Sequence, residues 1–525
     1  MWCACPMDEP EQTPGYHAAR DPDRAAIVMA ESGEVITYHQ LEERSSRAAR
    51  ALHDAGLRPG DHVALLIDNR AAMLELAWAA QRSGLYYTPV NTRLAADEAA
   101  YVVDDCGATV LFAAAAVAPL AVDVRARTPR VTRFVAVDGA IDGFEPMAAF
   151  VKGVAAGALA DEREGSPMLY SSGTTGRPKG VRRLVTGQPY GSDNPVGPLL
   201  DGVMGFGPGK VYLTPAPLYH SAPLVWSMTV HRSGGTLVLM EHFEAQACLD
   251  VIDREQVTHG QFVPTMFVRM LKLPDRVRDA FDGGSLEAVV HAAAPCPVEV
   301  KRRMIEWWGP IISEYYAGTE GGGLTLITSE EWLARPGSVG RAAWGEIHIC
   351  AESGEELPPG EPGVVRFGGG ANAFEYHNDP EKTRETFDER GWSTLWDVGY
   401  LDPDGYLFLT DRLTYMIVSG GVNIYPQEVE DHLLLHPKVG DAAVFGVPDA
   451  DLGEQVKAVV QPAAGVEGDP ELETELLEYC RAGLAHYKCP RSVDFEAELP
   501  RGDNGKLYKR VLRDRYWQGH ETRVL

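Results

Sequence analysis

One stretch of the chain carries the residue types that bind phosphate groups. It reads Tyr170-Ser-Ser-Gly-Thr-Thr-Gly-Arg-Pro-Lys-Gly180. Its glycines let backbone N–H groups turn toward a ligand, its hydroxyl groups add donors, and its cations suit phosphate oxygens. The spacing is not that of the Walker motif, and a plain surface loop is the alternative, but the embedded cations favour phosphate. The positions expected to bind phosphate are Ser171, Ser172, Gly173, Thr174, Thr175, Gly176 and Lys179.

The overall charge makes this stretch stand out. The 525 residues include 48 Lys and Arg against 75 Asp and Glu, so the net charge is −27. So acidic a surface repels nucleic acid and anionic membranes, and an anionic substrate needs a locally basic site. Arg177, Lys179, Arg182 and Arg183 place four cations within seven residues and supply such a site.

The composition also bears on location. No stretch of about 18 apolar residues is present, so we expect no membrane span. Residues 1–14 lack the charged region and apolar run of a secretory signal. The eight cysteines show no Cys-x-x-Cys spacing, and Cys3 and Cys5 fit a mobile tail better than a metal site. The predicted location is a reducing cytoplasm.

The elements that must position the phosphate loop alternate between strands and helices. Thr37 and Gln40 have the spacing of a capping box at the start of a helix. Residues 62–67 predict a buried strand, 71–82 a helix and 85–90 the next strand, and the alternation returns at 236–240, 244–256, 286–292 and 298–308. Continuous apolar strands between helices indicate parallel sheets covered on both faces.

The pattern changes after about Gly337. Short β-like runs at 346–350, 364–367 and 406–409 are separated by Gly and Pro, which suggests a small barrel or an antiparallel sheet. A compact α+β segment follows, with helices at 426–435 and 471–484 and strands near 442–447 and 455–461. A domain boundary is predicted near residues 411–414.

With these motifs in this order, the chain resembles the adenylate-forming superfamily of acyl-CoA synthetases, luciferases and peptide-synthetase adenylation domains, from about Asp21 to Arg515. It is most similar to bacterial fatty-acyl and aryl-acyl CoA ligases. The resemblance implies an α/β fold. Residues 1–411 would form a large N-terminal AMP-binding domain of two doubly wound sheets and a small β-barrel, and 412–525 a small mobile α+β domain, with a hinge near 412–415.

The resemblance implies a two-step reaction that uses ATP, Mg²⁺ and CoA. Tyr315-Tyr-Ala-Gly-Thr-Glu320 resembles the aromatic-Gly-x-Thr-Glu motif of the family, with Ala317 in the Gly place. Tyr316 would stack on adenine, with Tyr315 also in the nucleotide site. Thr319 would bond the α-phosphate and Glu320 would hold Mg²⁺. Without the family, a buried Tyr pair and a solvated Glu would be the plainer interpretation.

Further positions follow from the same resemblance. Asp397 matches the ribose-binding Asp, and Arg412 the second ribose contact. His291 to Pro297 resembles the wall of the adenine and acyl sites, where Ala292, Ala293 and Ala294 leave room for a ligand or merely allow tight packing.

Two segments match the acyl and CoA channels. Pro217-Leu-Tyr-His220 matches the segment whose aromatic or His side chains line the acyl and pantetheine channel, so Tyr219 and His220 would contact substrate, with His220 as a gate. A structural histidine is the alternative. Ser419-Gly-Gly-Val-Asn-Ile-Tyr-Pro426 resembles the CoA-tunnel loop, where Gly420 and Gly421 let the backbone approach pantetheine.

The chain also matches the terminal motif of the family. Pro500-Arg-Gly-Asp-Asn-Gly-Lys506 resembles Pro-Arg-x-x-x-Gly-Lys. Lys506 would bridge the attacking carboxylate and the α-phosphate and stabilise the transition state. Thr175, Glu320 and His220 complete the expected catalytic set. Relatives rotate the small domain between the two half-reactions.

Two departures affect the first half-reaction. Trp396 stands where relatives usually have Gly, directly before Asp397. Leu413, Thr414 and Tyr415 replace the polar hinge pair of most relatives. We therefore keep the alternative that the enzyme adenylates poorly, or accepts a preformed acyl-AMP and makes only the thioester.

Small side chains give the only indication of the acid. The positions expected to leave room are Ala292, Gly318, Gly321, Gly322 and Gly323, and those expected to form apolar walls are Phe262, Val263, Met266 and Phe267. They favour a large hydrophobic acid: fatty, aryl, or polycyclic terpenoid or steroid. The alternative is that the glycines serve only the loop.

Two other functions, and several possible partners, are alternatives to a CoA ligase that acts alone. An amino-acid module that loads a carrier protein usually has an Asp in the segment that here reads 218–222, which has none. A nucleotide-sensing scaffold with dead chemistry is disfavoured by Lys506 and Glu320. A homodimer and a partner enzyme that supplies acyl-AMP stay open, while nucleic acid is not expected as a partner.

Overall fold

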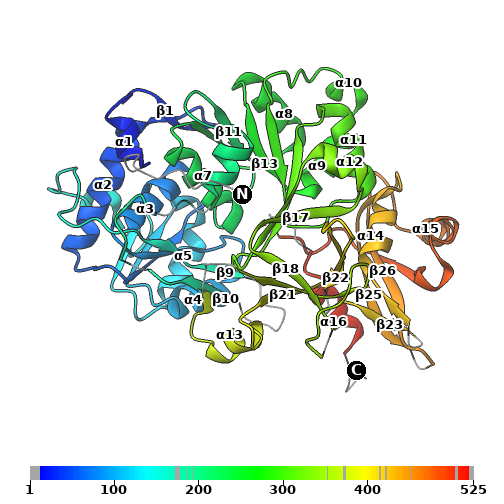
Figure 1. The fold of residues 1–525 in the computed structure, drawn as a ribbon. Helices are drawn as coiled ribbons and strands as arrows, with labels where there is room; N and C mark the ends of the chain where they lie inside the picture. Colours follow the sequence, from blue (N-terminus) through cyan, green and yellow to red (C-terminus); the bar gives the residue numbers. More distant parts are fainter. Residues whose placement is uncertain are drawn as a thin grey trace. The chain divides into compact units, whose positions relative to one another are not determined.

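The computed structural model describes residues 12–171, 178–185, 187–192, 194, 196–351, 353–369, 374–412, 415–419, 422–449, 451–502 and 507–518, without the side chains of 411, 412 and 423. The chain divides into two compact units (Figure 1). The first holds Met1–Gln261, Pro274–Val289 and Asn372–Thr383, and the second holds Phe262–Leu273, Val290–Ala371 and Arg384–Leu525. The predicted mobile domain from residue 412, with its hinge, stays a prediction.

A six-stranded parallel sheet with the order β7-β6-β5-β3-β4-β8 lies in the first unit. Its strands are β3 (His62–Leu66), β4 (Tyr86–Pro89), β5 (Val110–Ala113), β6 (Arg133–Ala136), β7 (Glu145–Pro146) and β8 (Ser166–Pro167). The accompanying helices are α1 (Pro14–Ala18), α2 (Tyr38–Asp54), α3 (Ala71–Arg82), α4 (Ala96–Asp105), η1 (Ala115–Val117), α5 (Ala118–Arg125) and α6 (Met147–Phe150).

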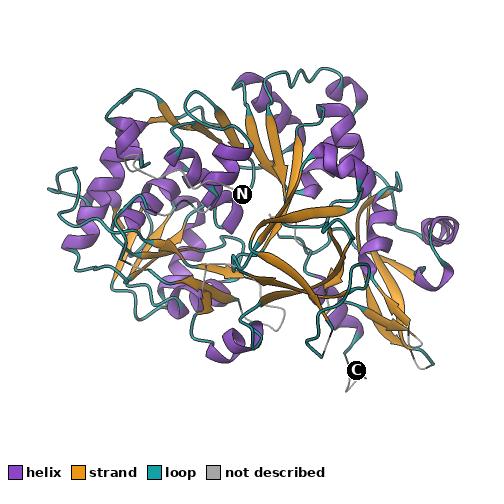
Figure 2. Ribbon diagram, in the orientation of Figure 1, coloured by secondary structure: helices purple, strands orange, loops and turns teal. Residues whose placement is uncertain are grey.

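Alternate strand residues bury both faces of this sheet, as the continuous apolar runs predicted. Ala64 and Leu111 pack in a cluster with α4 and α5. Phe112, the next residue along β5, contacts Phe150 of α6 with ring centroids 5.5 Å apart. Helices therefore cover both faces (Figure 2). The predicted helix at 71–82 is α3, and the predicted capping box of Thr37 and Gln40 opens α2.

A second, mainly parallel set of strands in the first unit has the order β13-β11-β12-β1-β2. Only β2 runs antiparallel to its neighbour. The strands are β1 (Ala25–Met29), β2 (Val35–Thr37), β11 (Val211–Thr214), β12 (Thr236–Leu239) and β13 (His259–Phe262). The helices are η2 (Pro198–Val203), α7 (Ser221–Arg232), α8 (Ala245–Arg254) and α10 (Asp275–Arg278). The predicted pair of parallel sheets is thus confirmed.

A buried histidine joins α3, α7 and β1. The indole N–H of Trp78 donates to Nδ1 of His231 at 3.0 Å, so Nδ1 carries no proton. The other ring nitrogen, Nε2, therefore donates to the carbonyl of Ala26 at 3.2 Å. Burial of this fully enclosed ring lowers the pKa of His231 from 6.5 to about 3. A neutral imidazole thus connects three elements of the first unit.

A three-stranded antiparallel sheet completes the first unit. It has the order β20-β10-β9, with β9 (Leu169–Ser171), β10 (Lys179–Arg183) and β20 (Phe374–Tyr376). Helix α13 (Pro380–Thr386) follows β20. A segment distant in sequence thus pairs with β10, the strand that follows the phosphate loop.

The second unit contains antiparallel strands in the order β18-β19-β21-β22-β17-β16-β15. These are β15 (Ile312–Ala317), β16 (Leu324–Ile327), β17 (Ser338–Trp344), β18 (Glu346–Cys350), β19 (Gly363–Gly368), β21 (Ser393–Leu401) and β22 (Leu407–Arg412). The other elements are α9 (Pro264–Leu271), α11 (Val298–Trp308) and α12 (Ser329–Ala334), and β14 (Ala288–His291) has its last two residues here. Among the described residues β18 stays at an edge, so the expected small β-barrel does not close, and the antiparallel alternative was correct.

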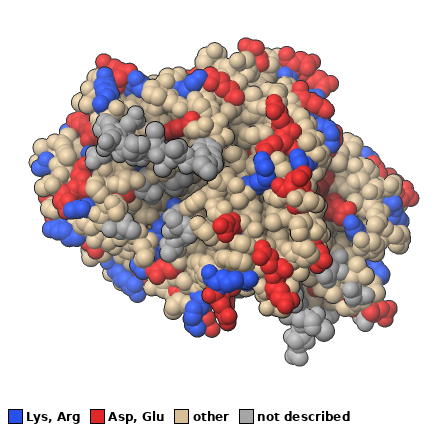
Figure 3. Space-filling view, viewed as in Figure 1, with Lys and Arg blue, Asp and Glu red and all other residues tan. Residues whose placement is uncertain are grey.

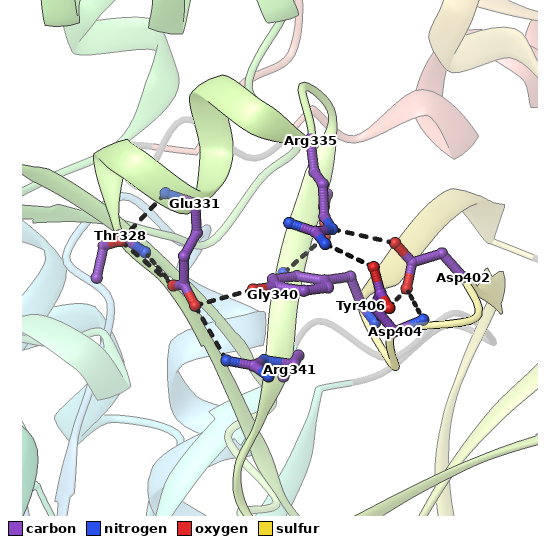
Figure 4. A network of polar contacts seen from close by, with 9 residues as sticks. Thr328, Glu331, Arg335, Gly340, Arg341, Asp402, Asp404 and Tyr406 are labelled. Atoms are coloured by element: carbon purple, nitrogen blue, oxygen red, sulfur yellow. Dashed lines mark hydrogen bonds and ion pairs between the residues drawn. The ribbon is translucent and has the colours of Figure 1, made fainter.

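A polar network fixes the turn between β21 and β22 (Figure 4). The hydroxyl of Tyr406 donates to Glu331 of α12 at 2.9 Å. Arg335, whose guanidinium lies 4.1 Å from the centre of the Tyr406 ring, pairs with Asp404 at 2.6 Å and Asp402 at 3.3 Å. This network holds the end of the two strands that carry Asp397 and Arg412.

The rest of the second unit is the predicted α+β segment. Its sheet has the order β24-β23-β26-β25, with β27 parallel to β26. The strands are β23 (Ile417–Ser419), β24 (Val422–Ile424), β25 (Val439–Asp449), β26 (Gly453–Pro462) and β27 (Ser492–Phe495). The helices are α14 (Pro426–Leu434), α15 (Pro470–Gly483), η3 (His486–Lys488) and α16 (Lys509–Tyr516). Alternate β25 residues bury both faces, since Val444 lies in one core cluster and Phe445 in another.

A buried ion pair joins α11 to β15. The ammonium of Lys301 lies 2.6 Å from the carboxylate of Glu314, and these side chains are 0% and 7% exposed. The same ammonium lies 5.0 Å from the centre of the Trp332 ring. Because both charges are removed from water, each depends on the other.

The described part of the chain contains no helix that combines the length and apolar character needed to cross a membrane. The six cysteines in that part, at 106, 248, 296, 350, 480 and 489, are not joined in disulfides.

Lys301→Met should destabilise the protein by about 3–5 kcal/mol, because it leaves the Glu314 carboxylate buried without its partner. Lys210→Met is the matched control, since Lys210 and Glu287 form an ion pair with 33% and 47% exposed side chains, and its loss should change stability by roughly 0–1 kcal/mol. Urea unfolding followed by tryptophan fluorescence measures both. Equal effects of the two variants would contradict the importance of the buried pair.

Acidification should weaken the first unit through His231. Its folded pKa of about 3 lies below the unfolded value of 6.5, so the contribution is complete above pH 6.5 and is lost as the pH falls toward 3. Between pH 7 and pH 5 this predicts a loss of about 2 kcal/mol from this group. His231→Asn should flatten that part of the pH profile, while His53→Asn, at an exposed site, should not. An unchanged profile in His231→Asn would refute the assignment.

Candidate active site

The stretch expected to bind phosphate lies between two paired antiparallel strands, β9 and β10. Ser171 ends β9 and lies directly opposite Lys179, which begins β10. Ser171 and Lys179 are both partly buried. The expected ligands Ser172, Gly173, Thr174, Thr175 and Gly176 lie outside the described residues. The structure therefore gives the two ends of the loop, at adjacent positions of paired strands.

The cations around this hairpin have acidic partners. Lys179 pairs with Asp379 at 2.7 Å, and Arg182 pairs with Glu375 on the neighbouring strand β20. On the face seen in Figure 3, most basic side chains likewise adjoin acidic ones. The acidic chain thus compensates these cations within its own fold. The sequence analysis missed Asp379; its signal was an Asp directly before the Pro that begins a helix.

A hydrogen bond brings two expected nucleotide residues together. The hydroxyl of Tyr316 on β15 donates to Oδ2 of Asp397 on β21 at 2.6 Å, across 81 positions of sequence. Asp397 is 6% exposed and also lies opposite Arg412 in the β21–β22 register. The expected adenine and ribose residues are therefore neighbours in one unit. Tyr315, the preceding residue, is buried.

The segment of three alanines begins where β14 ends. Ala292 is buried, and Ala293 is exposed with a φ of 76°, a left-handed conformation that is uncommon for a residue with a side chain. His291, directly before it, lies 3.5 Å from the carboxylate of Glu314. Burial, together with the charge of Lys301, holds the pKa of His291 well below its ordinary value, so the imidazole is neutral. Through Glu314 of β15, the buried Lys301–Glu314 pair thus contacts the residue that directly precedes the alanine segment.

Thr319 and Glu320 lie in a turn after β15. The N–H of Gly321 donates to the carbonyl of Gly318 at 3.1 Å, and Gly321 has a φ of 70°. Both Thr319 and Glu320 are partly buried. No group of three or more His, Cys, Asp or Glu side chains suited to a metal occurs in the part of the chain that the structure describes. A single carboxylate fits Mg²⁺ that is held largely by nucleotide phosphates.

Tight packing explains the glycines near Glu320. A Cβ on Gly318 would lie 2.5 Å from the Leu395 side chain, and one on Gly322 would lie 2.2 Å from the Ser393 hydroxyl. A Cβ on Gly323 would come within 2.2 Å of the Phe367 ring. These glycines are needed for packing against β19 and β21, so they give no independent sign of a wide acyl pocket. This favours the alternative that they serve the loop.

Trp396 adopts the backbone conformation of a glycine. Its φ is 63°, and its N–H donates to the Thr394 hydroxyl at 2.9 Å. For a residue with a side chain this left-handed conformation costs roughly 1–2 kcal/mol. The chain therefore holds a tryptophan in a conformation that glycine adopts most readily, and it places a large, partly buried indole directly before Asp397.

The expected acyl-site residues are distributed between the two units. Phe262 and Phe267 are 1% and 0% exposed, and their rings lie 5.5 Å and 6.0 Å from that of Trp308. Val263 is also buried. Such packing suits both a pocket wall and an ordinary core. In the first unit, Tyr219 and His220 have ring centroids 4.7 Å apart at the start of α7.

The other expected site residues lie in the C-terminal part of the chain, at or near the ends of the described ranges. Lys506, Gly420 and Gly421 lie outside the described residues, and Arg412 is described only by its backbone. The two ends of the Lys506 loop are fixed, because the N–H of Tyr508 donates to the carbonyl of Pro500 at 2.8 Å. Arg501 also pairs with Asp441 of β25 at 2.7 Å.

Comparison with known proteins agrees with this arrangement. The sequence pattern of the AMP-binding enzyme family matches residues 16–377, and that of the AMP-binding enzyme C-terminal domain matches 428–506. The chain is 34% identical to a feruloyl-CoA synthase from Amycolatopsis sp over 507 residues, covering 94% of this chain and 96% of that protein. It is 32% identical to a fatty acid–[acyl-carrier-protein] ligase from Streptomyces coeruleorubidus over 530 residues, covering 98% and 97%.

A solved structure extends the likeness to three dimensions. The o-succinylbenzoate CoA synthetase from Bacillus subtilis, in complex with its acyl-adenylate intermediate, superposes with a TM-score of 0.78 at 26% identity, covering 96% of this chain and 98% of that one. Taken with the hairpin at the phosphate loop and the Tyr316–Asp397 contact, these matches show that the chain belongs to the AMP-binding enzyme family.

Proposed function

We propose that this chain is an AMP-forming acid–thiol ligase, which converts a large hydrophobic carboxylic acid into its CoA thioester through an acyl-AMP. The observation that carries the proposal is the hydrogen bond between Tyr316 and Asp397. It joins the two motifs that resemble the family's adenine and ribose motifs; Tyr316 lies within the first matched region, and Asp397 lies between the two matched regions.

In the first step, a carboxylate oxygen forms a bond to the α-phosphorus of ATP. The bond from that phosphorus to the bridging oxygen breaks, and pyrophosphate leaves with the oxygen. The hydroxyls and N–H groups of the 171–179 hairpin would hold phosphate oxygens, and Lys506 would stabilise the charge that develops between carboxylate and phosphate. Glu320 would hold Mg²⁺, which neutralises phosphate charge.

In the second step, the thiol sulfur of CoA forms a bond to the acyl carbon. The bond from that carbon to the AMP oxygen breaks, AMP leaves, and the thiol proton passes to solvent or a base. Gly420 and Gly421 would admit pantetheine, with Tyr219 and His220 along its channel. Rotation of the segment after residue 412 between the two steps is part of the proposal.

The class of acid is inferred from the protein's relatives more than from its glycines. The relatives above act on feruloyl and fatty acyl groups, and the buried Phe262 and Phe267 supply apolar surface. The acyl-carrier-protein ligase keeps a carrier protein open as an alternative acceptor. A homodimer, a cytoplasmic location and a partner enzyme that supplies acyl-AMP stay predictions.

Trp396 supports one alternative, a ligase with weak adenylation. An indole held in a left-handed conformation directly before the ribose residue narrows the space for the nucleotide without altering the backbone. Such an enzyme would form thioester from a preformed acyl-adenylate faster than from the free acid.

ATP–pyrophosphate exchange against a panel of fatty, aryl and polycyclic acids should reveal one acid class that supports exchange. The same acids should yield CoA thioesters in the presence of ATP, because both reactions share the acyl-AMP. Thioester formation from synthetic adenylates alone would establish the second half-reaction without the first. Neither activity with any acid, adenylate, CoA or carrier protein would contradict the proposed function.

Trp396→Gly should raise the exchange rate about fivefold, equivalent to roughly 1 kcal/mol of barrier, if the indole restricts the nucleotide. Trp396→Phe is the control, because it keeps both an aromatic ring and a side chain in the left-handed conformation. Thioester formation from a synthetic adenylate should not change in either variant. An exchange rate that stays at the wild-type level in Trp396→Gly rules out the indole as the obstacle.

A further inference from the structure

The base of the phosphate loop is held by a segment that enters from far away in sequence. Residues 374–376 pair with β10 as strand β20, and residues 377–379 follow them at the base of the hairpin. The N–H of His377 donates to the carbonyl of Gly180 at 2.8 Å, and Asn378 follows with a φ of 58°. Asparagine tolerates this left-handed conformation better than most residues. The resulting turn brings Asp379 to the ammonium of Lys179.

Both oxygens of the Asp379 carboxylate are engaged. Oδ1 accepts from the backbone N–H of Lys382 at 2.9 Å, as the cap of helix α13, and Oδ2 accepts from Lys179 at 2.7 Å. The hydrogen bond from Lys179, with that from Lys382, holds the pKa of Asp379 below its ordinary value. The carboxylate is therefore a fixed, ionised acceptor that belongs to the helix and not to the loop.

A second contact ties the other strand of the hairpin to the same segment. The hydroxyl of Tyr170 on β9 donates to the Asp105 carboxylate at 2.6 Å. Asp105 also accepts from the side chains of His377 and Asn378, at 3.0 Å and 3.2 Å. Gly180 leaves room for the Tyr170 ring, since a Cβ at that position would lie 3.0 Å from it. Residues 377–379 thus hold the β10 end of the phosphate loop directly, and Asp105 connects the β9 end to the same segment.

These contacts have a consequence for phosphate binding. A lysine ammonium sits on a flexible stem, and ordering that stem when a ligand binds costs rotamer entropy. Asp379 accepts one of the three N–H bonds of Lys179 and so orders the stem before any ligand arrives. In the part of the chain that the structure describes, the ammonium of Lys179 donates only to Asp379, so two N–H groups are available for phosphate oxygens.

We propose that Asp379 is a positioning residue for nucleotide binding: it orders Lys179 and the base of the phosphate loop so that the triphosphate meets a preformed site. This inference rests on the proposed ATP-dependent function. The opposite role, in which Asp379 competes with phosphate for Lys179, is disfavoured because the helix cap keeps the carboxylate in place. It remains an outcome of the test.

The neighbouring ion pair offers a matched control. Arg182 and Glu375 join the same two strands and have 30% and 38% exposed side chains, close to the 20% and 32% of Lys179 and Asp379. Arg182 is separated from Lys179 by two residues along β10, and its alternating position points it to the other face of the strand. Glu375→Gln therefore removes a similar ion pair without loosening the base of the loop.

The test compares Asp379→Asn with Glu375→Gln in the full-length protein. Asp379→Asn should raise the KM for ATP about tenfold in pyrophosphate exchange and weaken equilibrium binding of ATP to the same extent. The KM for the acid, and thioester formation from a synthetic adenylate, should stay at wild-type levels. Glu375→Gln should leave all these values unchanged. Asp379→Glu should recover part of the loss.

Three results would overturn the inference. A lower KM for ATP in Asp379→Asn would mean that the carboxylate competes with phosphate. Equal effects of the two variants, accompanied by equal shifts in melting temperature, would mean a purely structural ion pair. Asp379→Asn weakening ATP binding further in a Lys179→Met background would mean that Asp379 does not act through Lys179. Since equilibrium ATP binding needs no turnover, these results are separable from failure to find an acid that is turned over.

Discussion

The ion pair between Lys179 and Asp379 sets the constraint on which the rest of the nucleotide site depends. On the proposed function, a chain with a net charge of −27 binds a triphosphate, and Lys179, the cation expected to contact it, is already held by the carboxylate of Asp379. The hairpin of β9 and β10 presents the loop, and a segment 200 residues away fixes the ends of that loop. On this account, the ordered position of Lys179, more than the net charge of the chain, creates the site for phosphate.

Two strained backbone positions in the second unit lie next to residues that are expected to bind the nucleotide. Ala293 and Trp396 both hold left-handed backbone conformations, at φ values of 76° and 63°. Ala293 follows β14, in the segment expected to form the wall of the adenine site. Trp396 directly precedes Asp397, the residue expected to bind the ribose. Residues in such conformations persist where the surrounding structure fixes them, and they gather at functional sites. The buried Lys301–Glu314 pair lies close to one of them, since Glu314 is 3.5 Å from His291, two residues before Ala293.

Much of the fold could be predicted because its signals are local. Helix α3 follows from its apolar pattern and the glycine after it, and the capping box at Thr37 needs only four residues. The barrel was wrong because closure depends on how strand edges meet, which short β-like runs do not specify. The glycines around Glu320 suggest room for a substrate or a role in the loop alone, and only the fold shows that Leu395, Ser393 and Phe367 occupy that space. Asp379 was missed for the same reason: its partner is distant in sequence, and only folding brings them together.

The most direct measurement follows the carboxylate oxygen. The acid identified by exchange would be labelled with ¹⁸O in its carboxylate and converted to thioester, and the AMP would be analysed by mass spectrometry. Attack on the α-phosphorus predicts that each AMP carries one ¹⁸O from the acid. Label found in inorganic phosphate, with ADP as the nucleotide product, would mean an acyl phosphate intermediate and would contradict the account.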